Sequence, residues 1–224
     1  MGLQERKERE KVERRAMILR CTKDLLLEKG SENVNMLDIA KKAELSKGTI
    51  YLYFSGKDDI FREICAEAEQ KFIKLFQSRM EPGLSALEMI KLYWLCYIDM
   101  FGESDDMIII FNMKEYIAPA FPFNPFEEQK QNMPYFFYTS IKEMIDQGIR
   151  EGIFDSSINS GSIARTMLSL FSHIVENAAK VKKEAQKSKI IIEEVKHIFE
   201  ILLRGIASDT FDRSNMLLPG LQQD

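Results

Sequence analysis

Two short segments with apolar residues at helical spacing, separated by a brief turn, constrain the fold of this chain more than any other feature. The first carries Ile39, Ala40 and Ala43, and the second carries Ile50 and Phe54 four residues apart. This pattern predicts two short helices that cross at a steep angle. Such a unit can place its second helix in the major groove of DNA.

The second segment has residues that suit contact with DNA. Ser46 is expected to cap the helix start, and Ile50 and Phe54 should point inward together. The outward side then carries Gly48, Thr49 and Leu52, flanked by Tyr53. A glycine lets the backbone approach closely, a threonine offers a hydroxyl and a methyl group to base edges, and a phenol can reach phosphate.

The chain that follows predicts the start of another helix. Ser55 and Asp58 are spaced as a capping box, and Lys57 falls in the first turn. A cation at this end opposes the helix dipole, so a phosphate bound at the same helix start explains it. The alternative is a solvated surface lysine.

Residues 17–61 resemble the DNA-binding domain of TetR-family transcriptional regulators in ILRCTKDLLLEKG, IAKKAELSKGTIYLYF and GKDDIF. Glu44 stands where the family usually has the turn glycine, which implies a left-handed residue costing roughly 1 kcal/mol or a different turn. Asn35 replaces the usual threonine and can still cap the helix and contact phosphate. The resemblance implies a homodimer that binds operator DNA and releases it when a small ligand enters a separate C-terminal domain.

We therefore predict an all-α protein with an N-terminal three-helix DNA-binding domain and a C-terminal helical ligand-binding and dimerisation domain. The helix-turn-helix domain should span residues 1–56, the C-terminal domain 57–210 and a polar tail 211–224. Two recognition helices in a dimer predict a palindromic operator. We predict that Asn35, Tyr53 and Lys57 contact phosphate groups of the DNA. The residues predicted to read the base sequence are Lys47, Gly48, Thr49, Tyr51 and Leu52.

Charge divides unevenly along the chain. Residues 1–60 carry 13 Lys or Arg against 11 Asp or Glu, a net charge of +2, whereas the remainder carries 18 against 24, a net charge of −6. Affinity for DNA of any sequence should therefore be modest and strongly dependent on salt. The alternating run from Glu5 to Arg15 could extend the first helix or add a basic arm that follows the DNA backbone. The alternative is a solvated helical face.

No run approaches 18 apolar residues and the N-terminus lacks an apolar signal region, so we expect a cytoplasmic protein with no membrane partner. Three cysteines lie far apart within apolar patterns, as is typical of reduced, buried thiols. Apolar periodicity predicts long helices near residues 8–29, 57–79, 84–101, 160–182 and 189–208, with another after Pro134.

Aromatic residues are concentrated in one part of the predicted C-terminal domain. Between Tyr93 and Tyr138 lie 13 of the 23 Phe, Tyr and Trp residues. They could line a cavity for a small hydrophobic or aromatic effector, or they could form a packed core. Lys114 would be the partner of an anionic ligand. The pocket candidates are Tyr93, Trp94, Tyr97, Phe101, Phe111, Met113, Lys114, Tyr116, Phe136 and Phe137.

The last two predicted helices have broad apolar faces that could pack against their copies in a four-helix dimer interface. The alternative is that both faces belong to the internal core. The interface candidates are Ile163, Met167, Leu170, Phe171 and Ile174 on one helix, and Ile191, Val195, Ile198, Leu202 and Ile206 on the other.

An enzyme is not expected, because the chain has no phosphate-binding glycine loop, no HExxH and no GxSxG. No cofactor is predicted, and no metal site, since the two histidines, His173 and His197, lie on different predicted helices. The remaining alternative is a helical protein-interaction module without sequence-specific DNA binding. Such a module would not need the outward face formed by residues 48–53.

Overall fold

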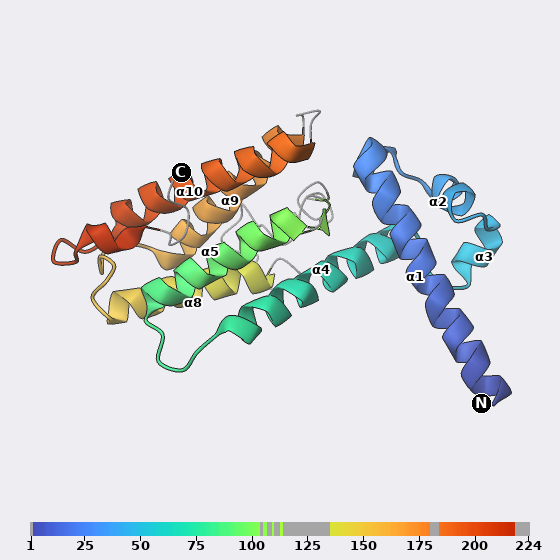
Figure 1. The fold of residues 1–224 in the computed structure, drawn as a ribbon, viewed down its shortest axis with the longest axis horizontal. Helices are drawn as coiled ribbons and strands as arrows, with labels where there is room; N and C mark the ends of the chain where they lie inside the picture. Colours follow the sequence, from blue (N-terminus) through green and yellow to red (C-terminus); the bar gives the residue numbers. More distant parts are fainter. Residues whose placement is uncertain are drawn as a thin grey trace.

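The computed structural model describes residues 2–103, 105–106, 109, 113, 135–179 and 184–217. Within them the chain forms eight α-helices and two short 3-10 helices, arranged as a small head and a larger body (Figure 1). The β-structure described in these residues is one isolated antiparallel β-bridge between Phe154 and Ala207. The predicted all-α fold is confirmed.

The head contains α1 (Leu3–Lys29), α2 (Met36–Lys42) and α3 (Lys47–Tyr51). A 3-10 turn, η1 (Ser31–Asn33), joins the first two helices. Gly30 ends α1 with φ 75°, and its N–H donates to the carbonyl of Leu26 at 3.0 Å. The head core is made of side chains that are almost completely buried: Ile18, Leu26, Ile39, Ile50 and Phe54.

The charged run at the N-terminus is helical. It extends α1 back to Leu3, five residues before the predicted start near Glu8. Residues 4–14 are exposed, and Val12, the apolar residue among them, is 60% exposed. The run therefore extends the first helix, with its side chains exposed.

The long α4 (Lys57–Arg79) connects head and body as one continuous helix (Figure 1). Its first turns bury Ile60, Phe61 and Ile64 beside α1, whereas Phe72, farther along, lies in the aromatic core of the body. The predicted boundary between residues 56 and 57 thus coincides with the start of α4. The head core nevertheless includes two turns beyond that boundary.

The body is built from α5 (Ala86–Glu103), α8 (Tyr135–Arg150), α9 (Ser160–Ala179) and α10 (Glu184–Ile206). α8 packs on α9, α9 packs on α10, and α5 contacts α4, α8 and α10. Gly83 and Gly152, both with positive φ, lie in the turns before α5 and after α8.

The segment predicted as a polar tail packs on the body as far as residue 217. Arg213–Met216 form the 3-10 helix η3, which contacts α10, and Met216 is fully buried. Lys91 on α5 donates a hydrogen bond to the carbonyl of Asn215. In the described part of this segment, residues 211–217, the buried Met216 anchors residues that are otherwise exposed or half-buried.

The predicted dimer faces divide between the interior of the chain and its surface. Most of their residues have at most 6% exposure in the single chain and belong to its own core: Met167, Phe171, Ile174, Ile191, Val195 and Ile206. These six side chains cannot lie on an interface without opening the body. The partly exposed candidates are Ile163, Leu170, Ile198 and Leu202, and Ile201, which was not predicted, is 70% exposed.

Candidate DNA-binding surface

Asn35 caps α2 by a reciprocal pair of hydrogen bonds. Its side-chain oxygen accepts from the N–H groups of Leu37 (2.9 Å) and Asp38 (3.1 Å), while the Asp38 carboxylate accepts from the Asn35 N–H at 3.1 Å. Lys29, 2.6 Å away, together with the Asn35 N–H, lowers the pKa of Asp38. With its oxygen engaged in the cap, Asn35 has its amide NH₂ left to offer to a phosphate.

The turn between α2 and α3 contains the strained residue that the sequence allowed. Glu44 has φ 54°, which lies in the left-handed region that favours glycine. The N–H of Glu44 donates to the carbonyl of Lys41 at 3.2 Å, and the N–H of Leu45 to that of Ala40 at 2.9 Å. The left-handed alternative is therefore the correct one.

Ser46 fixes the start of α3 and also orients Thr49. The Ser46 hydroxyl oxygen accepts from the Thr49 N–H at 3.0 Å, and the two hydroxyl oxygens lie 2.8 Å apart. A Cβ added at Gly48 would meet nothing closer than the Ser46 hydroxyl, 3.8 Å away. The first turn of α3 is thus open to the close approach of another molecule.

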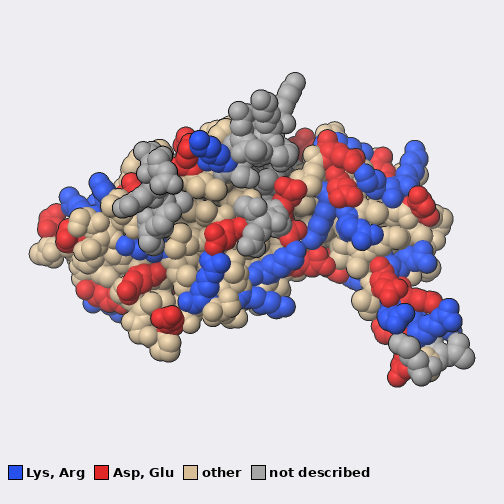
Figure 2. Space-filling model, viewed as in Figure 1, with Lys and Arg blue, Asp and Glu red and all other residues tan. Residues whose placement is uncertain are grey.

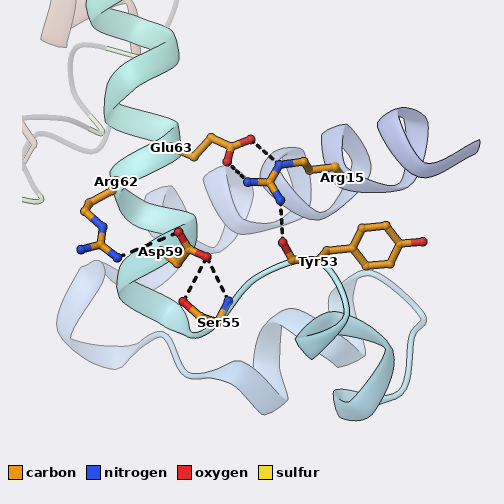
Figure 3. A network of polar contacts seen from close by, with 6 residues as sticks. All are labelled: Arg15, Tyr53, Ser55, Asp59, Arg62 and Glu63. Carbon is orange, nitrogen blue, oxygen red and sulfur yellow. Dashed lines mark hydrogen bonds and ion pairs between the residues drawn. The ribbon is translucent and has the colours of Figure 1, made fainter. Parts of the chain in front are cut away.

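Ile50 and Phe54 are buried as predicted, but α3 ends at Tyr51, and Thr49 of the predicted outward face is half-buried. Leu52 is 79% exposed and Tyr51 is 48% exposed, with the Lys47 ammonium 5.8 Å from the centre of the Tyr51 ring. Tyr53 is half-buried, and its ring points away from Arg15 (Figure 3). The structure therefore places one basic, one aromatic and one aliphatic side chain together beside an open glycine.

The start of α4 differs from the predicted capping box. Gly56 precedes the helix, and the backbone N–H and hydroxyl of Ser55 donate to the Asp59 carboxylate at 2.9 and 3.1 Å (Figure 3). These bonds lower the pKa of Asp59. The box with Asp58 was wrong because Gly56, and not Ser55, is the N-cap residue, and Ser55 pairs with Asp59 instead. Lys57 does lie in the first turn, 5.5 Å from the centre of the Phe61 ring.

Arg15 joins α1, the end of α3 and α4, a role that the sequence analysis missed. Its guanidinium binds the Glu63 carboxylate through two nitrogens, with Nε 2.8 Å from Oε1 (Figure 3). Nη1 donates to the Tyr53 carbonyl, and the guanidinium lies 4.1 Å from the centre of the Phe54 ring. The Glu63 hydrogen bond raises the pKa of Arg15, which stays charged. One signal in the sequence could have indicated this role: Arg15 stands where the charged run ends and the apolar residues of the first helix begin.

A second junction joins the head to the body. The Lys23 ammonium on α1 lies 3.1 Å from the carboxylate of Asp106, which follows α5 and is 6% exposed. Lys71 on α4 binds the other oxygen of Asp106, and Glu67 lies 3.0 Å from Lys23. Although burial opposes ionisation, the two lysines keep the pKa of Asp106 below its usual value.

Charges of both signs cover the head. On the face shown in Figure 2, Lys and Arg side chains lie among Asp and Glu side chains over α1 to α4. This mixture agrees with a net charge of only +2 for residues 1–60. Long-range attraction to DNA is therefore weak, and local contacts must decide where the head binds.

The described pocket candidates pack as an aromatic core. Trp94 stacks on Phe171 with ring centres 4.2 Å apart, and Phe72 lies 4.9 Å from Tyr93 and 4.7 Å from Tyr97. Six candidates are buried: Tyr93, Trp94, Tyr97, Phe101, Met113 and Phe137. Phe111, Lys114 and Tyr116 lie outside the described residues, as does the side chain of Phe136.

Three polar groups lie in or beside this apolar core. The buried Tyr97 hydroxyl lies close to that of Tyr93 but has no hydrogen bond of ordinary geometry to any described residue. Glu69 lies on the face of α4 that carries Phe72 and Phe76, and burial raises its pKa to about 7. The Tyr93 hydroxyl is 3.5 Å from the carbonyl of Phe137.

None of the helices formed by the described residues is long and apolar enough to span a membrane.

Comparison with protein families gives a match at the head. Residues 18–64 match the family described as "Bacterial regulatory proteins, tetR family". The matched range runs from the middle of α1 into the second turn of α4, and it includes both α2 and α3. It therefore contains Glu63, the α4 partner of Arg15.

Two curated relatives come from Bacillus subtilis (strain 168). The protein named "Uncharacterized HTH-type transcriptional regulator YdgC" is 26% identical over 167 residues, which cover 74% of this chain and 81% of the relative. A protein named "Fatty acid metabolism regulator protein" is 25% identical over 192 residues, covering 84% of this chain and 93% of its own length.

Among solved structures, a gamma-butyrolactone receptor described as ArpA-like has a TM-score of 0.65 at 17% identity. The alignment covers 92% of this chain and 94% of the receptor. At this identity the likeness shows a shared fold, and it extends over both the head and the body.

Proposed function

The chain belongs to the TetR family of transcriptional regulators, and on that premise we propose that it is a ligand-responsive repressor that binds palindromic operator DNA as a homodimer. Regulators of this family are not enzymes, and neither is this chain. The observation that carries the proposal is the outward face of α3, where Lys47, Tyr51 and Leu52 are exposed around an open Gly48.

The residues around α3 divide the work of binding DNA. Lys47, Gly48, Thr49, Tyr51 and Leu52 enter the major groove and contact base edges. Phosphate contacts from Asn35, Tyr53 and Lys57 flank this face and set the position of the head on the duplex. The Ser46 hydroxyl lies 2.8 Å from that of Thr49, so the Thr49 hydroxyl is held in place rather than free to rotate when it meets a base. A regulator that reads DNA works where the DNA is, which supports the cytoplasmic location expected from the sequence.

The dimer forms through the exposed side of the last two helices. Ile198, Leu202 and the 70% exposed Ile201 lie on α10, and Ile163 and Leu170 lie on α9. Association of two such faces would bury apolar groups that the single chain leaves in water. The two α3 helices would then be separated by one turn of DNA, about 34 Å, or by more.

The effector is a small, largely apolar molecule that binds among the aromatic side chains of the body. Tyr93, Trp94, Tyr97 and Phe137 supply the apolar surface, and the Tyr97 hydroxyl supplies a donor to an oxygen of the ligand. A gamma-butyrolactone and a fatty acid, the molecules in the names of two similar proteins, both combine an apolar chain with oxygen atoms. An anionic effector would instead use Lys114, which lies outside the described residues.

Binding of the effector reaches the head through α4 and the junction at Asp106. Phe72 on α4 is part of the aromatic core. Lys71, the residue before it, binds Asp106, which also binds Lys23 of α1. A ligand that displaces the aromatic rings would therefore shift the population of head arrangements. By linkage, the same ligand must bind more weakly to the DNA-bound form.

Selection of bound sequences from a random DNA pool tests the DNA-binding part of the proposal. We expect a palindromic site, and we expect Tyr53→Phe and Lys57→Ala to weaken binding to all sequences while Thr49→Ala changes the preferred sequence. Lys74→Ala, which removes an exposed lysine from the far part of α4, serves as the control. Failure to enrich any sequence at low salt would favour the alternative of a helical protein-interaction module.

A ligand screen by thermal shift, followed by titration, tests the response to an effector. A ligand found in this way should bind less tightly when saturating operator is present. Equal ligand affinity with and without operator would refute the coupling but would leave DNA binding in place.

A further inference from the structure

The N-terminal turns of α1 carry paired charges of both signs on one side of the helix and, among the described residues, unpaired positive charges on another. Arg6 pairs with Glu10 at 3.0 Å and Arg9 pairs with Glu13 at 3.2 Å, so that each arginine has an acidic partner one turn later. These four side chains neutralise one another on one side of the helix.

A different side of the same turns carries three cations. Lys7, Lys11 and Arg14 follow one another at spacings of four and three residues, and all three are exposed. None of them forms an ion pair within 4.0 Å with an acidic group in the described part of the chain. On a helical wheel they fall within about 40° of Ile18, whereas the nearest acidic residues of the run, Glu8 and Glu10, lie about 80° away. We call these three residues the cationic stripe.

The cationic stripe is aligned with the face of α1 that packs into the head. Ile18 and Leu25 continue the same line and are 0% and 7% exposed. Cys21, beside this line, contacts the carbonyl of Lys42 at the end of α2, and Arg15 on its other side contacts the carbonyl of Tyr53 at the end of α3. The stripe therefore faces the same side of α1 as the helix-turn-helix unit.

The turns that carry the stripe project beyond the head. In Figure 1 the N-terminal part of α1 extends past α3 and stands clear of the other helices. From Lys7 to Arg14 the helix rises about 10 Å, the length of about three base pairs along a DNA strand. The stripe is thus long enough to follow a phosphate backbone beyond the groove that α3 enters.

We propose that Lys7, Lys11 and Arg14 form a second DNA contact, on the phosphate backbone adjoining the base pairs bound by α3. This contact rests on the proposed function, since α3 must first place the head on DNA. It reads no sequence, because ammonium and guanidinium groups on phosphate add affinity without selecting bases. The contact is also compatible with the Arg6–Glu10 and Arg9–Glu13 pairs on the other side of the helix, because each glutamate there is neutralised by an arginine and does not repel the phosphates.

The contact has a quantitative signature in the salt dependence of binding. Each phosphate that is neutralised adds about 0.9 to the slope of log K against log salt concentration. Three contacts would add about 2.7 for each head, and about 5 for a dimer with both heads bound. Neutralising two of the three residues would lower the slope by about 1.8 for each head.

The full-length protein offers a matched pair of variants for this test. Lys7→Gln/Lys11→Gln removes two positive charges from the stripe, and Arg6→Gln/Arg9→Gln removes two from the paired side of the same turns. Both have the same change in net charge and leave α3 untouched. Operator affinity is measured by fluorescence anisotropy at several salt concentrations, and circular dichroism at each concentration confirms that the helix content is unchanged.

We expect the stripe variant to lower the slope by about 1.8 for each head and to weaken operator and random DNA equally, while the paired-side variant changes the slope by less than about 0.5. An equal fall in both variants, or no fall in either, would overturn the contact while leaving the proposed function intact. Absence of operator binding by the unmodified protein would overturn the proposed function itself, and the contact with it.

Discussion

Arg15 offers the most direct test of how the head is held in shape. The guanidinium contacts α4 through Glu63, the end of α3 through the Tyr53 carbonyl and the ring of Phe54 at the same time. Replacement by lysine keeps the charge but removes the planar fork, so a single ammonium group cannot hold both oxygens. We therefore expect Arg15→Lys to be clearly destabilising and Arg15→Gln to be more so.

The magnitude follows from the three contacts. The Arg15–Glu63 pair is partly exposed and contributes about 0.2–1 kcal/mol. The charged hydrogen bond to the Tyr53 carbonyl contributes about 1.5 kcal/mol, and the position over the ring of Phe54 about 0.5–1 kcal/mol. Arg15→Gln should therefore cost about 2–3 kcal/mol, which for a chain of this length lowers Tm by about 5–10 °C.

The assay is thermal unfolding by circular dichroism, together with operator affinity at a temperature where each variant is folded. Arg20→Gln, an exposed arginine on the same helix, is the control and should leave both quantities unchanged. If Arg15→Lys had the Tm and the operator affinity of the unmodified protein, the three-way contact would be irrelevant to the head and the reasoning would be refuted.

Three further predictions concern single residues. Glu44→Gly should stabilise the protein by about 1 kcal/mol and raise Tm, because φ 54° is strained for glutamate and not for glycine; an unchanged or lower Tm would count against this strain. Burial raises the pKa of Glu69 to about 7, so the folded protein binds this proton more tightly than the unfolded chain does. The protonated carboxyl group therefore contributes stability that is complete below pH 4.5 and is lost as pH rises through 7. Glu69→Gln should accordingly raise Tm at pH 8 but not at pH 4.5, and an equal shift at both values would exclude this explanation. Tyr97→Phe should raise the stability of the effector-free protein by about 1 kcal/mol, since it removes a buried hydroxyl without a partner among the described residues; a fall in the unfolding midpoint in denaturant would mean that the hydroxyl is satisfied.

The helices could be predicted from the sequence because apolar periodicity and end signals coincide along most of the chain. α4 begins at Lys57 and ends at Arg79, as expected, and Gly30 ends α1. The two caps at Asn35 and Ser46 were also predicted, since they depend on residues next to one another in the chain. Local rules predict local structure well.

Contacts between distant segments could not be predicted in this way. Arg15 lies 48 residues from Glu63, and Lys23 lies 83 residues from Asp106, so no spacing rule connects them. A charged run gives the same pattern whether its residues are solvated or join two helices. Met216 was missed for a related reason, because the polar residues around it concealed a single buried anchor.

The predicted dimer residues show a further limit of the sequence. An apolar stripe on a helix indicates that the face is covered, and it does not distinguish a neighbour in the same chain from a second copy. Val195 and Ile191 are covered by their own chain, whereas the adjoining Ile201 is left in water. Burial in the folded chain is what separates these two groups.

The continuity of α4 has a mechanical consequence. A helix of 23 residues is about 34 Å long and bends little, so a rotation at one end becomes a displacement at the other. A tilt of about 5° about the body end moves the first turn by about 3 Å, close to the 3.4 Å rise between neighbouring phosphates on a strand. Adjustments among the rings around Phe72 that are too small to alter the fold are therefore sufficient to shift a head by about one base pair.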